Sequence, residues 1–142
     1  MNRLRRRPHD SEELARALTR VNRRLRRERQ SDLSASQLSL MGMLREHGPG
    51  TPSDLAKGEC VSAPSITRML KGLTERGLVT KTAHPHDGRQ VLISLSTEGE
   101  TTLDVERRRR DAWLHEEIAQ LDARERAVLR EASSILNRLA DA

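Results

Sequence analysis

The stretch from Thr51 to Gly99 constrains the fold more than any other part of the chain. It begins as a short helix over 52–57, a four-residue turn and an amphipathic helix over 62–73, which Gly77 ends. Two strand-like runs then follow and are joined by a basic tip that contains an Asp-Gly pair. This order of elements predicts a winged helix-turn-helix, an arrangement that commonly reads duplex DNA.

Helices are expected on both sides of this stretch, over about 11–30, from 34 to Gly48, from 97 and from 122. Residues that can cap a helix N-terminus start each helix: Ser11, Ser34 with Gln37, Thr51 with Asp54, Thr97 with Glu100 (or Ser96 instead), and Asp122 with Glu125. Apolar residues recur at helical spacing along the first helix (Leu14, Ala17 or Leu18, Val21, Leu25) and the last one (Val128, Leu129, Ala132, Ile135, Leu136, Leu139).

The composition fits long helices with narrow apolar stripes. Phe and Tyr are absent, Trp113 is the only aromatic residue, and apolar and charged residues make up 35% and 33% of the chain. Such helices often complete their burial against a second chain. We therefore expect a mainly α fold with a small two- to three-stranded antiparallel wing. The expected parts are a disordered basic arm (1–10), a dimerisation helix (11–31), a winged helix-turn-helix region (34–96) and a helical dimerisation region (97–142).

Positive charge is concentrated in two regions of a chain whose net charge is +5. Residues 1–30 hold eleven arginines and four acidic residues, and residues 61–90 hold five basic and two acidic residues. Residues 97–142 hold eight arginines and eleven acidic residues. Basic charge around a helix-turn-helix favours double-stranded DNA as the partner, although charge alone is also compatible with an ordinary soluble basic protein.

The central motifs resemble those of the MarR family of bacterial transcriptional regulators. The matching segments are Ser62 to Arg68, Gly77-Leu78-Val79, Asp87-Gly88-Arg89 and Leu95-Ser96-Thr97-Glu98-Gly99. The resemblance implies a homodimeric repressor of pseudo-palindromic operators, with a small effector ligand between its dimerisation and DNA-binding regions. For this chain an anionic or aromatic effector is the expected class, since an apolar pocket with arginines could bind it.

The second helix of the motif is the expected recognition helix. Ile66, Met69 or Leu70, and Leu73 fix its buried side. The residues placed in the first turn or on the other sides are the expected DNA contacts: Ser62, Pro64, Ser65, Thr67, Arg68 and Lys71. Arg68 could read guanine or hold a phosphate. Ser62 could equally be only a helix cap, and Arg68 only a solvated charge.

The hairpin tip is the second expected contact. Lys81, Asp87 and Arg89 lie on or beside its turn, and Val91, Ile93 and Leu95 are expected to form the buried face of one strand. By the family resemblance, Arg89 enters the minor groove and Asp87 orients it. An Asp-Gly pair is also simply a good tight turn, so the turn and the contact are compatible.

Other functions find little support in the sequence. Cys60 could sense oxidants, but a lone cysteine between two short helices is more often a small core residue. No recognised metal, cofactor or enzyme motif is present, so neither a cofactor nor catalysis is expected. With one cysteine and no transmembrane-length apolar run, the expected location is the cytoplasm, without a membrane partner. A winged-helix module that binds proteins rather than specific DNA sequences remains the alternative.

Overall fold

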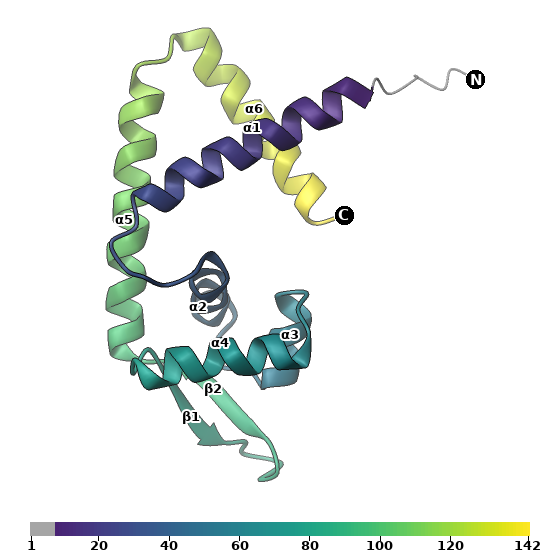
Figure 1. The fold of residues 1–142 in the computed structure, drawn as a ribbon, viewed down its shortest axis with the longest axis vertical. Coiled ribbons are helices and arrows are strands. Elements are labelled where there is room, and N and C mark those ends of the chain that lie inside the picture. The colour runs from purple at the N-terminus through teal and green to yellow at the C-terminus, as the bar shows by residue number, and fades with distance from the viewer. Residues whose placement is uncertain (1–7) are drawn as a thin grey trace, which may run out of the picture.

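The computed structural model describes residues 8–142, and it places a compact winged helix below a long helical frame (Figure 1). The elements are α1 (Pro8–Arg27), α2 (Ala35–His47), α3 (Pro52–Gly58), α4 (Ala63–Glu75), β1 (Val79–Ala83), β2 (Val91–Leu95), α5 (Thr97–Ala119) and α6 (Ala123–Ala140). The mainly α fold with a small antiparallel wing is thereby confirmed. No helix within the described part of the chain is long and apolar enough to cross a membrane.

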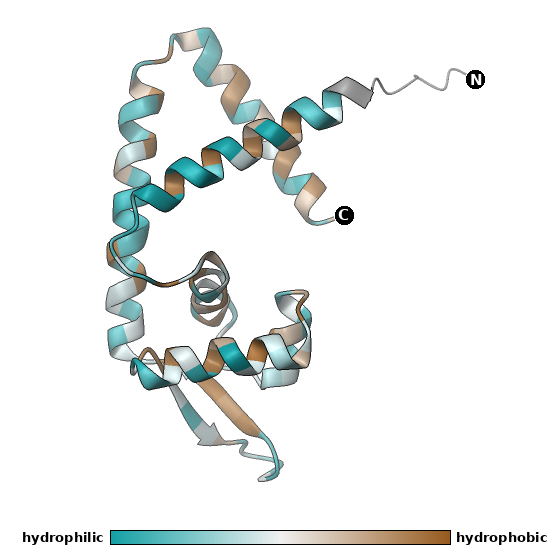
Figure 2. Cartoon of the chain, in the orientation of Figure 1, coloured by the Kyte–Doolittle hydropathy of each residue, from teal (hydrophilic) through white to brown (hydrophobic). Residues whose placement is uncertain are grey.

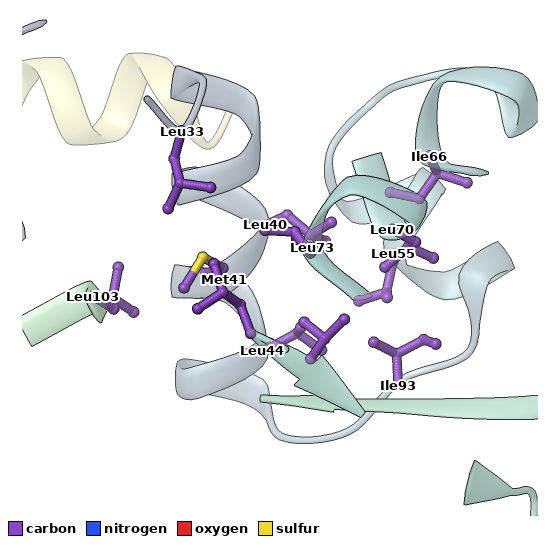
Figure 3. Close-up of a cluster of buried hydrophobic side chains, with 12 residues drawn as sticks. Leu33, Leu40, Met41, Leu44, Leu55, Ile66, Leu70, Leu73, Ile93 and Leu103 are labelled. Atoms are coloured by element: carbon purple, nitrogen blue, oxygen red, sulfur yellow. The ribbon is translucent and has the colours of Figure 1, made fainter. Parts of the chain in front are cut away.

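The hydrophobic core belongs to the winged helix (Figure 3). Its side chains come from α2, α3, α4, both strands and one turn of α5, and the most buried of them are Leu40, Met41, Ile66, Leu73 and Ile93. On α4 the buried side is formed by Ile66, Leu70 and Leu73, whereas Met69 is only half-buried. This core fixes the position of α4 relative to the wing.

The wing is a two-stranded antiparallel sheet in which Val79 pairs with Leu95 and Ala83 with Val91. A single bridge between Gly50 and Ile93 adds the start of a third strand. Ile93 is fully buried and Leu95 is half-buried, but Val91 is 41% exposed. The predicted burial of Val91 is therefore wrong, because its pair lies at the tip of the wing, beyond the helices that cover Ile93.

The predicted caps form at Ser34, Thr51, Ser62 and Asp122, and at the start of α5 the structure selects Ser96, the predicted alternative to Thr97. Ser34 with Gln37 and Asp122 with Glu125 form full capping boxes, and Ser62 caps α4. Thr51 caps α3 alone, without a return bond from Asp54. Ser96 caps α5 rather than Thr97, since the Ser96 hydroxyl accepts from the Gly99 amide and donates to the Gly77 carbonyl.

The first helix begins at Pro8, so the predicted start at Ser11 is wrong. Proline suits the first turn of a helix because its missing N–H would have no partner there, and Asp10 favours the positive end of the helix dipole. The remainder of the predicted basic arm, residues 1–7, lies outside the described residues.

Helices α1 and α6 extend away from the winged helix, and Figure 2 shows apolar patches along both of them. The side chains of Leu18 and Val21 on α1, and of Val128 and Leu139 on α6, are 46–59% exposed. Near its C-terminal end, α1 contacts α5, where the Arg24 guanidinium lies 5.1 Å from the centre of the Trp113 ring. The apolar stripes are thus formed as predicted but are uncovered in a single chain.

The charged middle of α5 contains a buried carboxylate. Glu106 is 7% exposed, and its Oε1 accepts hydrogen bonds from the backbone amides of Gln30 and Ser31, at 3.2 and 2.8 Å. Glu106 and Arg110 have the i,i+4 spacing of an ion pair, but Arg110 pairs with Asp111 instead. Because Gln30 and Ser31 belong to the α1–α2 linker (28–34), Glu106 ties this linker to α5.

Candidate nucleic-acid interface

Helix α4 presents one side of its N-terminal half to solvent. The Ser62 hydroxyl accepts from the Ser65 amide at 3.3 Å and lies 3.0 Å from the Ser65 hydroxyl, so both serines are engaged in the cap. The cap role of Ser62 is thus present, and because its side chain is exposed the role leaves room for a ligand contact. Pro64 lies in the first turn and is exposed.

The cationic side chains of α4 lie on the surface. Thr67, Arg68 and Lys71 are all exposed, whereas Ser65 is half-buried. The Thr67 hydroxyl donates to the Ala63 carbonyl one turn earlier. Within residues 8–142, neither Arg68 nor Lys71 has a carboxylate partner. Their positive charge is therefore available to an anionic ligand.

The wing tip carries two further exposed cations, Lys81 and Arg89. The Asp87 carboxylate accepts from the Arg89 backbone amide at 3.1 Å, and no ion pair joins the two side chains in the described structure. Asp87 therefore contacts Arg89 through the turn backbone, and its orientation of the Arg89 guanidinium on DNA remains a prediction.

His84 also shapes the wing tip, a role that the sequence analysis missed. Its Nδ1 accepts from the backbone amides of His86 and Asp87, each at 3.2 Å. A half-buried histidine that closes a turn in this way resembles an Asx turn, in which a side chain substitutes for a backbone acceptor. The only sequence signal for it was its place at the start of the tip.

The two surfaces lie at the same end of the molecule. In Figure 1, α4 and the wing occupy the lower end, and α2 separates them from α1 and α6. The nine predicted site residues fall on these two elements, and eight of them are exposed. A helix with exposed cations beside a basic hairpin has the dimensions and the charge to contact a major groove and its neighbouring backbone.

Cys60 lies in the turn that leads into α4. It is exposed and has a φ of 54°, in the left-handed region. The interpretation of Cys60 as a small core residue is therefore wrong. The turn requires a positive φ at this position, and this geometry directs the side chain outward.

The C-terminal end of α4 is tied to the α1–α2 linker. The Arg76 guanidinium donates to the Asp32 carboxylate at 2.6 Å. This hydrogen bond lowers the pKa of Asp32 below its ordinary value and raises the pKa of Arg76. This contact therefore stabilises the folded state at pH values above the pKa that Asp32 has in the unfolded chain. The stabilisation is lost as the pH falls through the lower pKa that Asp32 has in the folded chain.

A cavity of about 610 Å³ lies between α1, α2 and α5. Leu38 and Leu103 contribute apolar surface. The charged lining residues are three arginines and four glutamates: Arg29, Arg107, Arg110, Glu28, Glu46, Glu59 and Glu106. The second carboxylate oxygen of Glu106, Oε2, is buried without a hydrogen-bond partner in the described structure. The cavity thus combines apolar walls with charged groups of both signs, one of which, Glu106, has a buried oxygen without a hydrogen bond.

Metal chemistry has no support in the described residues. No group of three or more His, Cys, Asp and Glu side chains within 8–142 is placed to hold a metal ion. His84 and His86 have their rings 6.1 Å apart, but they contact each other edge to face.

Comparison with known proteins identifies a family. The MarR family model matches residues 33–91. An uncharacterized HTH-type transcriptional regulator of Mycobacterium bovis is 42% identical over 130 residues, which are 91% of this chain and 91% of that protein.

Solved structures show the same fold. A putative transcriptional regulator from Pseudomonas aeruginosa has a TM-score of 0.82 and 36% identity, over 94% of this chain and 95% of its own. A mutant MarR from E. coli has a TM-score of 0.72 and 29% identity, over 87% and 95% of the two chains. These relatives are described as regulators, not as enzymes.

Proposed function

Since this chain belongs to the MarR family of DNA-binding transcriptional regulators, we propose that it is an effector-responsive repressor that binds pseudo-palindromic operators as a homodimer. The observation that carries the proposal is the pairing of two surfaces at opposite ends of one chain. Unpaired cations on α4 and the wing lie at one end, and uncovered apolar stripes on α1 and α6 lie at the other (Figures 1 and 2).

The DNA-binding part of the proposal rests on α4 and the wing. The exposed first half of α4 would enter the major groove, where Arg68 could make a bidentate contact with guanine and Lys71 could hold a phosphate. Arg89 on the wing would enter the neighbouring minor groove, whose negative potential favours arginine where the groove is narrow. Small side chains at Ser62, Pro64 and Ser65 would allow the helix to approach the base edges closely.

The homodimer is supported by the exposed stripes. On α6, Leu129 and Ile135 are 41% and 42% exposed, and every residue of this helix remains outside the buried core. No surface within residues 8–142 of the single chain covers them, whereas a second copy can bury the α1 and α6 stripes together. A two-fold dimer would then present two α4 helices to two half-sites one helical turn apart.

The effector part rests on the cavity between α1, α2 and α5. Its apolar walls favour a planar or aliphatic body, and an anionic group of the ligand could pair with one of its arginines, whereas the four glutamates of the lining would repel it elsewhere. A ligand that binds one conformer better shifts the population toward it. Repression would be relieved if the favoured conformer holds the two α4 helices at a spacing that does not match the operator.

The test begins with selection of bound sequences from random duplex DNA, followed by titration of the selected duplex with Arg68→Ala. If Arg68 reads a base, the variant should lose about 1–3 kcal/mol of binding free energy on the selected duplex and much less on duplexes changed at the contacted base. Arg109→Ala is the matched control, because Arg109 is exposed on α5 and forms no ion pair in the described structure.

Two outcomes would contradict the proposal. If no sequence is enriched and binding is weak at moderate salt, the protein is a winged-helix interaction module instead. If Arg68→Ala and Arg109→Ala bind the selected duplex equally well, Arg68 does not belong to the interface.

A further inference from the structure

Helix α1 carries a second charged surface that the operator interface does not use. Four arginines follow one side of this helix at spacings of four, three and four residues: Arg16, Arg20, Arg23 and Arg27. The apolar stripe of α1 has the same spacing but begins at Leu14, two positions earlier. At 100° per residue, the two stripes lie on nearly opposite sides of the helix.

The arginine stripe is open to solvent and largely unpaired. All four side chains are exposed, and only Arg16 has an acidic partner in the described part of the chain, Glu12 at 3.8 Å. Ala15 and Thr19 lie between Arg16, Arg20 and Arg23, and these residues line a shallow hollow of about 330 Å³. Three guanidinium groups of the stripe thus lie around one hollow between neighbouring side chains of α1.

Such a stripe destabilises the helix that carries it. Like charges three or four residues apart on a helix repel one another, and here this holds for Arg16 with Arg20, Arg20 with Arg23, and Arg23 with Arg27. The basic residues of α1 are all arginine, with no lysine among them. Arginine differs from lysine in its planar fork of donors, which matches phosphate geometry.

The stripe spans about 17 Å along α1, a length over which one DNA strand presents about five phosphates. In Figure 1, α2 lies between α1 and the surface formed by α4 and the wing. A dimer that buries the apolar stripe of α1 would leave the opposite, arginine side facing outward.

We infer that the arginine stripe of α1 is a second, sequence-independent site for the phosphate backbone of duplex DNA. A regulator bound to its operator through α4 could then hold a separate DNA segment through α1. The operator interface and the homodimer of the previous subsection serve as the premise of the assay, and the second site is tested independently of Arg68.

The experiment uses the full chain and two duplexes. The selected operator is immobilised and saturated with protein, and capture of a labelled, unrelated mixed-sequence duplex is measured at several salt concentrations. The test variant is Arg20→Gln with Arg23→Gln. The matched control is Arg109→Gln with Arg130→Gln, which removes the same charge from exposed positions of α5 and α6.

Wild type and the control should capture the second duplex, and the capture should weaken steeply with salt. The test variant should bind the operator normally but lose at least about tenfold in affinity for the second duplex, with a salt slope smaller by about 2. Arg68→Ala should lose affinity for the operator. It should keep its affinity for mixed-sequence DNA offered alone, because it retains the α1 site.

Several results would overturn the inference. Equal capture by the test variant and wild type, or no capture by wild type, excludes the site. Equal loss in the control shows that only net charge matters. A test variant that sediments as a monomer shows that these arginines contact the partner subunit, and wild-type binding to anionic phospholipid vesicles without second-duplex capture shows that the ligand is a membrane.

Discussion

At the scale of single residues, the fold depends on the absence of a side chain at Gly99. Gly99 is buried in the first turn of α5, and a Cβ atom at this position would lie 2.1 Å from the Leu78 carbonyl oxygen. A backbone carbonyl cannot move aside as a flexible side chain can. The close approach lets α5 begin directly against the start of the wing.

We expect Gly99→Ala to lower the free energy of unfolding by about 1–3 kcal/mol or more, as overpacking does in a rigid environment. The measurement is urea denaturation at fixed protein concentration, read as a shift in midpoint with an unchanged slope. Gly88→Ala on the wing tip is the matched control, because no atom lies within 4 Å of its added Cβ. Equal stability of the two variants would mean that α5 shifts freely away from Leu78.

Residue roles were predictable from the sequence only where the partner is close in the chain. The Ser34, Ser62 and Asp122 caps depend on residues three positions ahead, and all three are confirmed. Glu106 and Asp32 have partners 75 and 44 residues away, and nothing in the local sequence marks them. The DNA contacts assigned to single residues of α4 and the wing remain predictions.

At the scale of elements, periodicity identified the helices and the hairpin because each has one apolar side. It failed at element ends, where tertiary contacts decide the structure. Val91 continues the alternation of β2, yet it extends past the covering helices and stays exposed. In the same way, Ser96 caps α5 because its hydroxyl also reaches the Gly77 carbonyl, a contact that spans the whole hairpin.

For the wing, Arg89→Ala should reduce operator affinity and lower the slope of log affinity against log salt by about 0.9 for each wing that binds. The fold should be unaffected, because an exposed arginine that forms no ion pair within residues 8–142 contributes little to stability. Asp87→Ala should act in the same direction but more weakly, since it frees the turn backbone without removing the cation. The measurement is a titration of the operator with Arg89→Ala and with wild type at several salt concentrations. If the two plots of log affinity against log salt coincide, the wing does not belong to the interface.

At the scale of the whole molecule, the chain divides into a winged helix with its own core and a frame of helices that lacks one. The sequence predicted this division from the apolar stripes at both ends. The sequence could not predict how exposed the apolar side chains of these stripes are, because their exposure depends on how α1 and α6 extend from α5 (Figure 1).

We expect wild type to sediment as a dimer at micromolar concentration, and Leu129→Glu with Ile135→Glu to sediment as a monomer. The paired variant should keep its helical content and lose most operator affinity, because each half-site would then be bound alone. Ala127→Glu with Ser134→Glu adds the same charge to exposed positions on the other side of α6 and should remain dimeric. If both double variants sediment as dimers, the subunit contact does not involve the apolar stripe of α6.

The α1–α2 linker links the two ends of the molecule. Glu28 and Arg29 at its start line the cavity, Glu106 holds its middle, and Asp32 near its end holds Arg76 at the end of α4. For the proposed effector, this arrangement has a thermodynamic consequence. A ligand that weakens operator binding by some factor must itself be bound more weakly, by the same factor, when the operator is occupied. Operator-bound molecules would therefore be the last in the cell to sense the effector, and unbound molecules would act as its reservoir.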